Sequence, residues 1–271
     1  LDVDIVFNIC EGRNGRNRQS RVPMLLEMNN IPYVGSDALT LGMTLDKVVA
    51  KKLFISESIP TPKFFVAHNA FDLPNLSQFK FPLIVKTRHE GSSKGISAAS
   101  QVYDEKSLRQ RVGHIIDTYQ QPALVEEFIH GTEFTVAVLG NHPPQAQPVV
   151  QVSIDGSTEL GEKFYTNELI YDEALKYICP AKISYNLSSK LQAIAVKAYQ
   201  CVECRDFGRV DFRVDKDDNP FVLEINPYPS LDKDDVFNLF PNVYGSDYTE
   251  AVCKIIEYGL ERYEKSLAVS Q

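Results

Sequence analysis

The sequence predicts a mixed fold, in which a small parallel α/β piece precedes a larger α+β region. Within the first 35 residues, the apolar run 4–9 ends at a glycine-rich polar loop, residues 24–28 indicate a helix, and 31–35 indicate a second strand. Strand, helix and strand in this order favour a parallel α/β unit. From residue 81 onward strands cluster with few helices, which indicates an antiparallel or mixed sheet.

The remaining elements follow from apolar periodicity and from breaks at proline and glycine. A helix opens near Thr44 and runs towards Glu57, where the prolines at 60 and 62 stop it. The pattern also predicts strands at 81–87, 123–129, 134–139, 147–154, 209–214 and 221–225, and helices at 105–119, 187–201 and 248–264. No regular element is predicted for 155–177.

Composition excludes several classes of protein. At 271 residues, with 44% hydrophobic and 24% charged side chains, the chain is close to the globular average, which excludes disordered and low-complexity proteins. No apolar run approaches the roughly 20 residues that cross a bilayer. A net charge of −8 without a basic block argues against nucleic acid, and we expect no membrane partner. Five scattered cysteines without a secretory signal predict reduced thiols and a cytoplasmic protein.

The segment 208–227 is the most informative. Two alternating runs flank a turn-rich stretch, which predicts a β-hairpin. A turn centred between residues 217 and 218 would place Asp211 opposite Glu224 and Arg209 opposite Asn226. The alternation then puts these apolar side chains on one face: Val210, Phe212, Val214, Phe221, Leu223 and Ile225.

Two carboxylates directly opposite each other destabilise a strand pair unless a positive group lies between them. Arg209 or Arg213 could supply that charge, which would make this an ordinary charged face. A divalent cation is the alternative, because Asp211, Glu224 and Asn226 offer the hard oxygen donors that Mg²⁺ takes when it also holds phosphates. Spacing alone leaves both interpretations open.

Candidates for phosphate binding lie elsewhere, although Walker A and G-x-G-x-x-G motifs are absent. The run Glu90–Gly95, here called the glycine-serine loop, lies between two predicted strands, and its backbone N–H groups could fold over an anion. Lys86 ends the preceding strand, and strand-end lysines can meet phosphate as point charges. For Lys86 and Lys47 taken alone, a solvated surface position is the alternative.

Taken together, nine segments in order resemble the ATP-grasp fold, and within it the D-alanine–D-alanine ligase family. The segments are 31–36, 45–47, 81–86, 90–95, 125–129, 133–136, 179–181, 209–212 and 223–226. The resemblance implies α/β plus α+β architecture: a truncated N-terminal parallel α/β subdomain, then two mixed or antiparallel-sheet subdomains that sandwich ATP. We divide the chain into 1–43, 44–129 and 130–271. Since it begins at Leu1 inside a strand-like run, we expect its first βαβ elements to be missing.

The resemblance implies that one set of residues binds ATP: Lys47, Lys86, Glu90, Gly91, Ser92, Ser93, Gly95, Glu126, Phe128, Ile129 and Glu133. The two lysines would contact the phosphates, and the glycine-serine loop would close over them. Glu126 would accept a hydrogen bond from the adenine amino group, and Glu133 would bind the ribose.

The resemblance also implies the reaction. Asp211, Glu224 and Asn226 would hold two Mg²⁺ ions, with Mn²⁺ as an alternative, while Arg209 and Ser92 would be catalytic. A carboxylate attacks the γ-phosphate of ATP in this family, and an amine then displaces phosphate from the acyl phosphate, so no protein nucleophile is needed. Positioning and electrostatics would be the enzyme's contribution.

Three segments depart from the family pattern. The first loop has Glu11-Gly12 and Gly15-Arg16-Asn17-Arg18 in place of His-Gly and Gly-Glu-Asp-Gly, Asn226–Asp232 lacks a glycine, and Phe164–Glu168 keeps only the start of a tyrosine-rich pattern. These are amino-acid-binding positions, so we expect small-molecule amino-acid substrates with altered specificity. A non-catalytic or truncated ATP-binding module is the alternative. A homodimer is also allowed.

Overall fold

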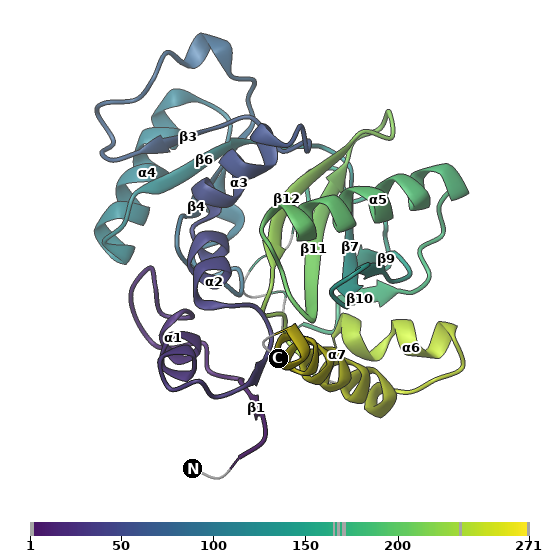
Figure 1. Cartoon of the computed structure of the whole chain (residues 1–271). Helices are drawn as coiled ribbons and strands as arrows, with labels where there is room; N and C mark the ends of the chain where they lie inside the picture. Colours follow the sequence, from purple (N-terminus) through teal and green to yellow (C-terminus); the bar gives the residue numbers. More distant parts are fainter. Residues whose placement is uncertain (1–2, 165, 167–168, 170–171, 233–234, 270–271) are drawn as a thin grey trace.

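The structure is a computed structural model that describes residues 3–164, 166, 169, 172–232 and 235–269 (Figure 1). The N-terminal piece contains strand β1 (Val6–Phe7), helix α1 (Arg21–Met28) and strand β2 (Tyr33–Val34), and the two strands pair in parallel as predicted. Strand β1 is shorter than expected, because the Asn8 side chain accepts a hydrogen bond from the Cys10 N–H (3.0 Å) and turns the chain.

The smaller of two antiparallel sheets has the order β3-β6-β4-β5. Its strands are β3 (Phe64–Ala67), β4 (Leu83–Thr87), β5 (Gln101–Val102) and β6 (Ala123–Glu127), with short 3₁₀ helices η1 (Leu76–Gln78) and η2 (Ala98–Ser100) between them. Helix α4 (Glu105–Tyr119) covers the sheet and begins at Asp104, which forms a capping box with Ser107. The sequence did not predict β3.

The larger sheet has the order β10-β9-β7-β11-β12, and β8 pairs with β7. Its strands are β7 (Thr132–Leu139), β8 (Gln145–Ala146), β9 (Val150–Ile154), β10 (Leu175–Ile178), β11 (Phe207–Val214) and β12 (Pro220–Asn226). Strand β10 corrects the expectation of no regular element in 155–177; it pairs with β9 although its own residues are only half-buried or exposed.

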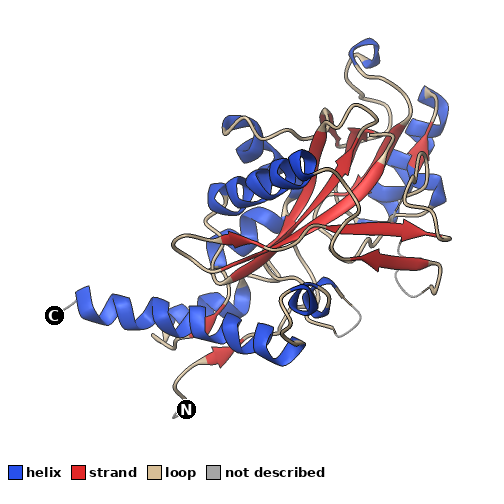
Figure 2. Ribbon diagram, turned by 90° about the vertical axis from the view of Figure 1, so that its right-hand side faces the viewer, coloured by secondary structure: helices blue, strands red, loops and turns tan. Residues whose placement is uncertain are grey.

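Helices lie on both sides of the larger sheet (Figure 2). Helix α5 (Tyr185–Cys201) packs on one face, while η4 (Val236–Asn238), α6 (Phe240–Val243) and α7 (Tyr248–Val269) pack on the other. No helix in the described part of the chain is both long and apolar enough to span a bilayer. All five cysteines are free.

The predicted helix 44–57 is two helices, α2 (Ala38–Leu45) and α3 (Lys47–Ser56), which meet at Asp46. Asp46 has extended backbone angles, and its carboxylate accepts hydrogen bonds from the N–H groups of Val48 and Val49, so it begins α3. Ala50 and Phe54 of α3 pack in the core of the larger sheet. The divisions at residues 43 and 129 stay a prediction.

The hairpin has the predicted register at the end away from its turn, where Arg209 pairs with Asn226 and Asp211 pairs with Glu224. A β-bulge then changes the register, because Phe212 pairs with Val222 and Leu223 is the extra residue. The prediction that Phe221 and Leu223 lie on the same face as Val210 and Phe212 is therefore wrong. Val222 is buried in their place, and Leu223 lines the cavity described below.

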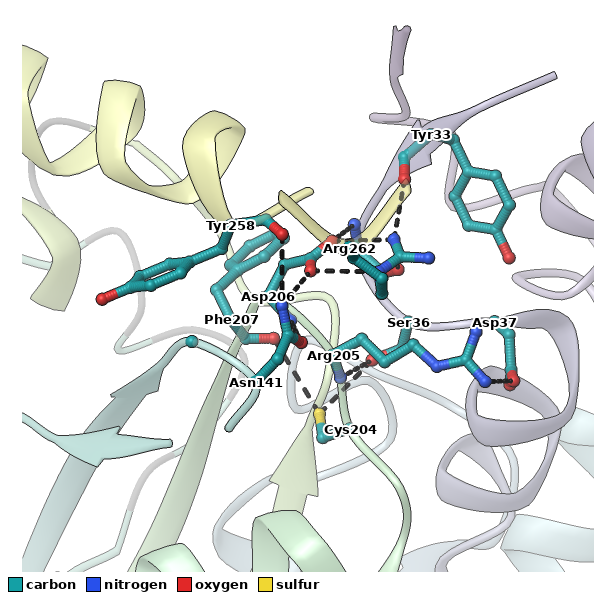
Figure 3. Close-up of polar contacts among 12 residues, drawn as sticks. Tyr33, Ser36, Asp37, Asn141, Cys204, Arg205, Asp206, Phe207, Tyr258 and Arg262 are labelled. Carbon is teal, nitrogen blue, oxygen red and sulfur yellow. Dashed lines mark hydrogen bonds and ion pairs between the residues drawn. The ribbon is translucent and has the colours of Figure 1, made fainter. Parts of the chain in front are cut away.

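An ion pair with a fully buried carboxylate joins the N-terminal piece to the rest of the molecule (Figure 3). Asp206, just before β11, pairs with Arg262 of α7 at 3.0 Å and accepts a hydrogen bond from the Gly35 N–H at 2.7 Å. Arg262 also donates to the Tyr33 carbonyl oxygen (2.8 Å). These contacts fix β2, α7 and the start of β11 together.

Candidate active site

A cavity of about 830 Å³ lies between the two sheets. It is lined by the start of α3, by β4 and the glycine-serine loop, by the β6–β7 connection, and by β11 and β12. Most residues expected at the site line this cavity: Lys47, Lys86, Glu90, Gly91, Ser92, Ser93, Glu126, Phe128, Ile129, Glu133, Arg209, Asp211, Glu224 and Asn226. Four separate parts of the chain thus contribute side chains to one space.

Gly95 does not line the cavity, although we expected it to bind the nucleotide. Its φ is +82°, and a Cβ there would lie 2.7 Å from Thr87 Cγ2. Its carbonyl oxygen accepts a hydrogen bond from Arg111 Nη2 at 2.6 Å. Gly95 therefore shapes the base of the loop, where a side chain would not fit.

The glycine-serine loop is held by its neighbours. Thr87 Oγ1 donates to the Lys94 carbonyl oxygen (2.8 Å), and Lys47 Nζ donates to the Glu90 carbonyl oxygen (2.5 Å). Ser92 and Ser93 both have left-handed backbone angles, with φ of 50° and 52°. Successive residues away from the extended conformation can turn their N–H groups towards one side, which suits an anion.

Glu126 lies between two lysines. Its Oε1 is 2.5 Å from Lys51 Nζ and its Oε2 is 2.8 Å from Lys86 Nζ, and all three side chains are nearly or fully buried. Burial by itself would raise the pKa of Glu126, but the two lysines lower it to about 2. Burial lowers the pKa of Lys51, whereas for Lys86 the attraction to Glu126 outweighs burial and raises the pKa.

Sequence reasoning missed Lys51. It lies one helical turn after Lys47, and that spacing places both lysines on one side of α3. Lys51 also donates to Thr61 Oγ1 at 2.6 Å. A lysine among the buried positions of a helix was the available signal, but nothing in the pattern named Glu126 as its partner.

Two aromatic side chains line the cavity together with Glu133. The Phe128 ring contacts Phe164 edge-on, with 5.7 Å between ring centroids, and the Arg213 guanidinium lies 4.6 Å from the Phe128 centroid. Burial raises the pKa of Glu133, and Arg213 only partly opposes this shift. Aromatic rings and one carboxylate lining the same cavity suit a purine nucleoside.

The acidic pair on the hairpin has cationic partners in this structure. Arg209 Nε is 3.0 Å from Asp211 Oδ1, and Lys47 Nζ is 3.1 Å from Glu224 Oε2. Thr135 Oγ1 also donates to Asp211 at 2.6 Å. The pKa of Asp211 is raised, first by burial and then by the charge of Glu224, although Arg209 opposes both effects.

The donor set at this position fits Mg²⁺. Within the described residues, no three His, Cys, Asp or Glu side chains are grouped as a metal site. Asp211, Glu224 and the Asn226 amide supply two carboxylates and one neutral oxygen. Mg²⁺ commonly binds one or two carboxylates and completes its shell with waters and substrate phosphates, so this set suits an ion that arrives with a nucleotide.

Asp235 is a further lining residue that the sequence did not indicate. It lies 3.4 Å from Arg209 Nη1, so Arg209 is held between two carboxylates, those of Asp211 and Asp235. Burial by itself would lower the pKa of Arg209, but the two negative charges outweigh it and raise that pKa. Glu11, Gln19 and Ser230 also line the cavity. Of these, Glu11 and Ser230 belong to segments that depart from the expected pattern.

Comparison with known proteins identifies the family. A family model described as "D-ala D-ala ligase C-terminus" matches residues 58–257. The chain belongs to the D-alanine–D-alanine ligase family. It therefore has the ATP-grasp fold and is an ATP-dependent ligase that forms a C–N bond.

Relatives of the family match nearly the whole chain. A D-alanine–D-alanine ligase of Carboxydothermus hydrogenoformans is 32% identical over 97% of this chain and 84% of that protein. An uncharacterized protein of Sinorhizobium fredii is 38% identical over 96% of this chain and 75% of that protein. The D-alanine–D-alanine ligase of Bacillus anthracis complexed with ATP has a TM-score of 0.79 at 23% identity, covering 98% of this chain and 82% of that one.

The structure describes two of the three segments that depart from the family pattern more fully than the third. The first loop and the Asn226–Asp232 segment both contribute lining residues, among them Glu11 and Asp232. Of the tyrosine-rich segment, Phe164 and Thr166 are described, whereas positions 165, 167 and 168 lie outside the described residues.

Proposed function

We propose that the protein is an ATP- and Mg²⁺-dependent carboxylate–amine ligase that joins amino acids or peptides through an acyl phosphate, with a substrate choice that differs from D-alanine–D-alanine ligases. One observation supports this most strongly. Two lysines, a loop suited to anions, an opposed acidic pair and Arg209 all line one cavity. Together they provide for phosphate binding, charge neutralisation and substrate positioning.

Separate groups of residues would bind the phosphates, the metal ions and the adenosine. Lys47 and Lys86 would bind phosphate oxygens, and the glycine-serine loop would cover them and exclude water. Mg²⁺ held by Asp211, Glu224 and Asn226 would neutralise charge on the phosphates, and we propose two ions. Phe128, Ile129, Glu126 and Glu133 would hold adenosine. The geometry that supports these roles is the shared cavity.

Arg209 would orient the reacting carboxylate and stabilise negative charge on the transferred phosphoryl group. Its two acidic neighbours, Asp211 and Asp235, hold the guanidinium at the cavity wall. A pre-positioned arginine needs little rearrangement when charge develops, and this makes its electrostatic contribution effective. The side chain of Ser92 lies on the loop that would cover the phosphates.

The altered substrate choice is supported by residues of the departing segments that line the cavity, namely Glu11, Ser230 and Asp232. In the family, a glycine N–H serves the oxyanion in the segment that here reads Asn226–Asp232. Side chains of different size and charge at these positions would bind a different amino acid or peptide.

The test is a screen of ADP release by the protein with Mg²⁺, ATP and pairs of amino acids, followed by mass spectrometry of the product. The proposal predicts ADP release that depends on both substrates and a product whose mass is the sum of the two minus water. Binding of ATP without substrate-dependent ADP release across the screen would instead favour a non-catalytic nucleotide-binding module. This is the second candidate function, because the segments expected to bind the substrates depart from the family pattern.

A further inference from the structure

The first loop, residues 11–19, lies against the glycine-serine loop. Glu11 and Gln19 at its ends line the cavity. Between them, Arg18 contacts the start of the glycine-serine loop and Arg16 contacts Asp46. Gly12 keeps the first loop folded on itself, because a Cβ there would lie 2.6 Å from the Arg18 carbonyl oxygen. Two loops that both line one cavity are therefore in direct contact.

Arg18 makes the first of these contacts. Its side chain is 7% exposed, its Nη1 donates to the His89 carbonyl oxygen at 2.6 Å, and the same atom lies 3.7 Å from Glu90 Oε2. A buried guanidinium is costly unless its charge is paired and its N–H groups are satisfied. The main chain and carboxylate at the start of the glycine-serine loop meet that need.

Asp46 makes the second contact. Its carboxylate is fully buried. It accepts hydrogen bonds from two nitrogens of Arg88 at 2.7 Å each and from Arg16 at 2.9 Å, and His89 Nε2 lies 3.3 Å from it. Arg88 and His89 immediately precede the glycine-serine loop, and Arg16 belongs to the first loop. Since Asp46 also begins α3, one carboxylate connects both loops to the helix whose first residue is Lys47.

We propose that Arg18 and Asp46 are positioning residues that couple the first loop to the glycine-serine loop, so that a nucleotide bound under one loop favours binding of the amino-acid substrate beside the other. This inference rests on the proposed function for the identity of the ligands. A ligand that orders one loop reduces the conformational entropy that the second ligand must still remove. Such coupling acts equally in both directions.

Arg16 and Arg18 stand where the family pattern has Glu and the second Gly. The contacts with Asp46 and Glu90 therefore come from residues in which this chain departs from that pattern. The coupling would be a property of this chain and of relatives that keep a basic first loop.

Amide hydrogen exchange of the ligand-free protein tests the connection itself. Arg18→Ala should raise exchange in residues 88–95 by about tenfold, because the loop loses its charged anchor. Arg18→Lys should restore part of the protection. Arg109→Ala, which removes an exposed ion pair with Glu105, is the matched control and should leave both loops unchanged. Unchanged exchange in 88–95 would overturn the proposal.

A second variant tests the same connection with a smaller risk that the protein fails to fold. Arg16 is 57% exposed in its side chain, so Arg16→Ala removes little packing and should leave the fold intact. We expect exchange to rise in both loops, by about threefold. A change confined to residues 11–19 would contradict the bridge through Asp46.

The coupling is tested with AMP-PNP and Mg²⁺ as probe. In the unaltered protein AMP-PNP should slow exchange in residues 11–19, and Arg18→Ala should remove that effect and weaken AMP-PNP binding by about tenfold. If AMP-PNP binds and residues 11–19 do not respond, the coupling is wrong. If AMP-PNP does not bind at all, the proposed function fails, and the ligand-free comparison still decides whether the loops are connected.

Discussion

At the scale of single residues, the structure shows how a buried charge cluster is kept in place. Glu126 is ionised although it is buried, because Lys51 and Lys86 each bind one of its oxygens. Removing one member of a buried ion pair leaves the other uncompensated, and that is more costly than the pair is stabilising. The cluster therefore ties the position of Lys86, a proposed phosphate ligand, to the stability of the fold.

Glu126→Gln should lower the free energy of unfolding by about 3 kcal/mol at pH 7, because two buried lysines lose their counter-ion. The pKa of Glu126 is about 2, below its ordinary value of 4.5. The stability that this carboxylate contributes is thus present above pH 4.5 and is lost as the pH falls from there towards 2.

Urea unfolding at pH 7 and at stepped values down to pH 3 measures this. The variant should show a shallower loss of stability in that range than the unaltered protein. Glu127→Gln changes the next residue, which accepts a hydrogen bond from the Lys80 N–H at 3.0 Å, and should cost less than about 1 kcal/mol. Equal losses in the two variants would contradict the assignment.

At the scale of elements, the hairpin β11–β12 shows what a sequence pattern can and cannot reveal. The acidic, proline-containing turn predicted the pairing of Asp211 with Glu224, and the structure confirms it. The bulge at Leu223 was not predictable, because strict alternation contains no mark of one extra residue. Its effect is local: Val222 enters the core, and Leu223 joins the cavity lining.

The turn between β6 and β7 packs against this hairpin at Gly131, whose φ is +150°. A Cβ there would lie 1.9 Å from the Val214 carbonyl oxygen, and a backbone atom cannot move aside as a flexible side chain can. Gly131→Ala should therefore cost about 3 kcal/mol of folding free energy.

The control is Gly156→Ala, which has φ of +76° and nothing within 4 Å of the added Cβ, so only backbone strain of about 1 kcal/mol should appear. Thermal and urea unfolding of both variants measure the difference. A Gly131→Ala variant no less stable than Gly156→Ala would show that this contact does not constrain the turn.

At the scale of the whole molecule, segments that follow one another in the sequence indicated the fold, and nearly all of the site residues expected from them line the cavity. The long-range contacts were not available from sequence. Helix α3 packs on the larger sheet, Lys51 meets Glu126 from another element, and Asp206 meets Arg262 across 56 positions of the chain (Figure 3). Each depends on how separate elements come together, and local periodicity does not report on that.

Arg262→Met should cost about 3 kcal/mol, because buried Asp206 would keep only neutral hydrogen-bond donors such as the Gly35 N–H. Lys254→Met removes an exposed ion pair with Glu257 on the same helix and should cost less than about 0.5 kcal/mol. Urea unfolding compares the two. If both variants lose the same small amount, the junction in Figure 3 does not hold the N-terminal piece.

The central claim is that the opposed carboxylates on the hairpin serve Mg²⁺ and ATP in a ligase reaction. The most direct measurement is substrate-dependent ADP release by Glu224→Gln, with the exposed Glu257→Gln as control. The account predicts that Glu224→Gln loses at least about 10³-fold in rate, while the control retains its rate and both variants stay folded. Undiminished ADP release by folded Glu224→Gln would contradict the account.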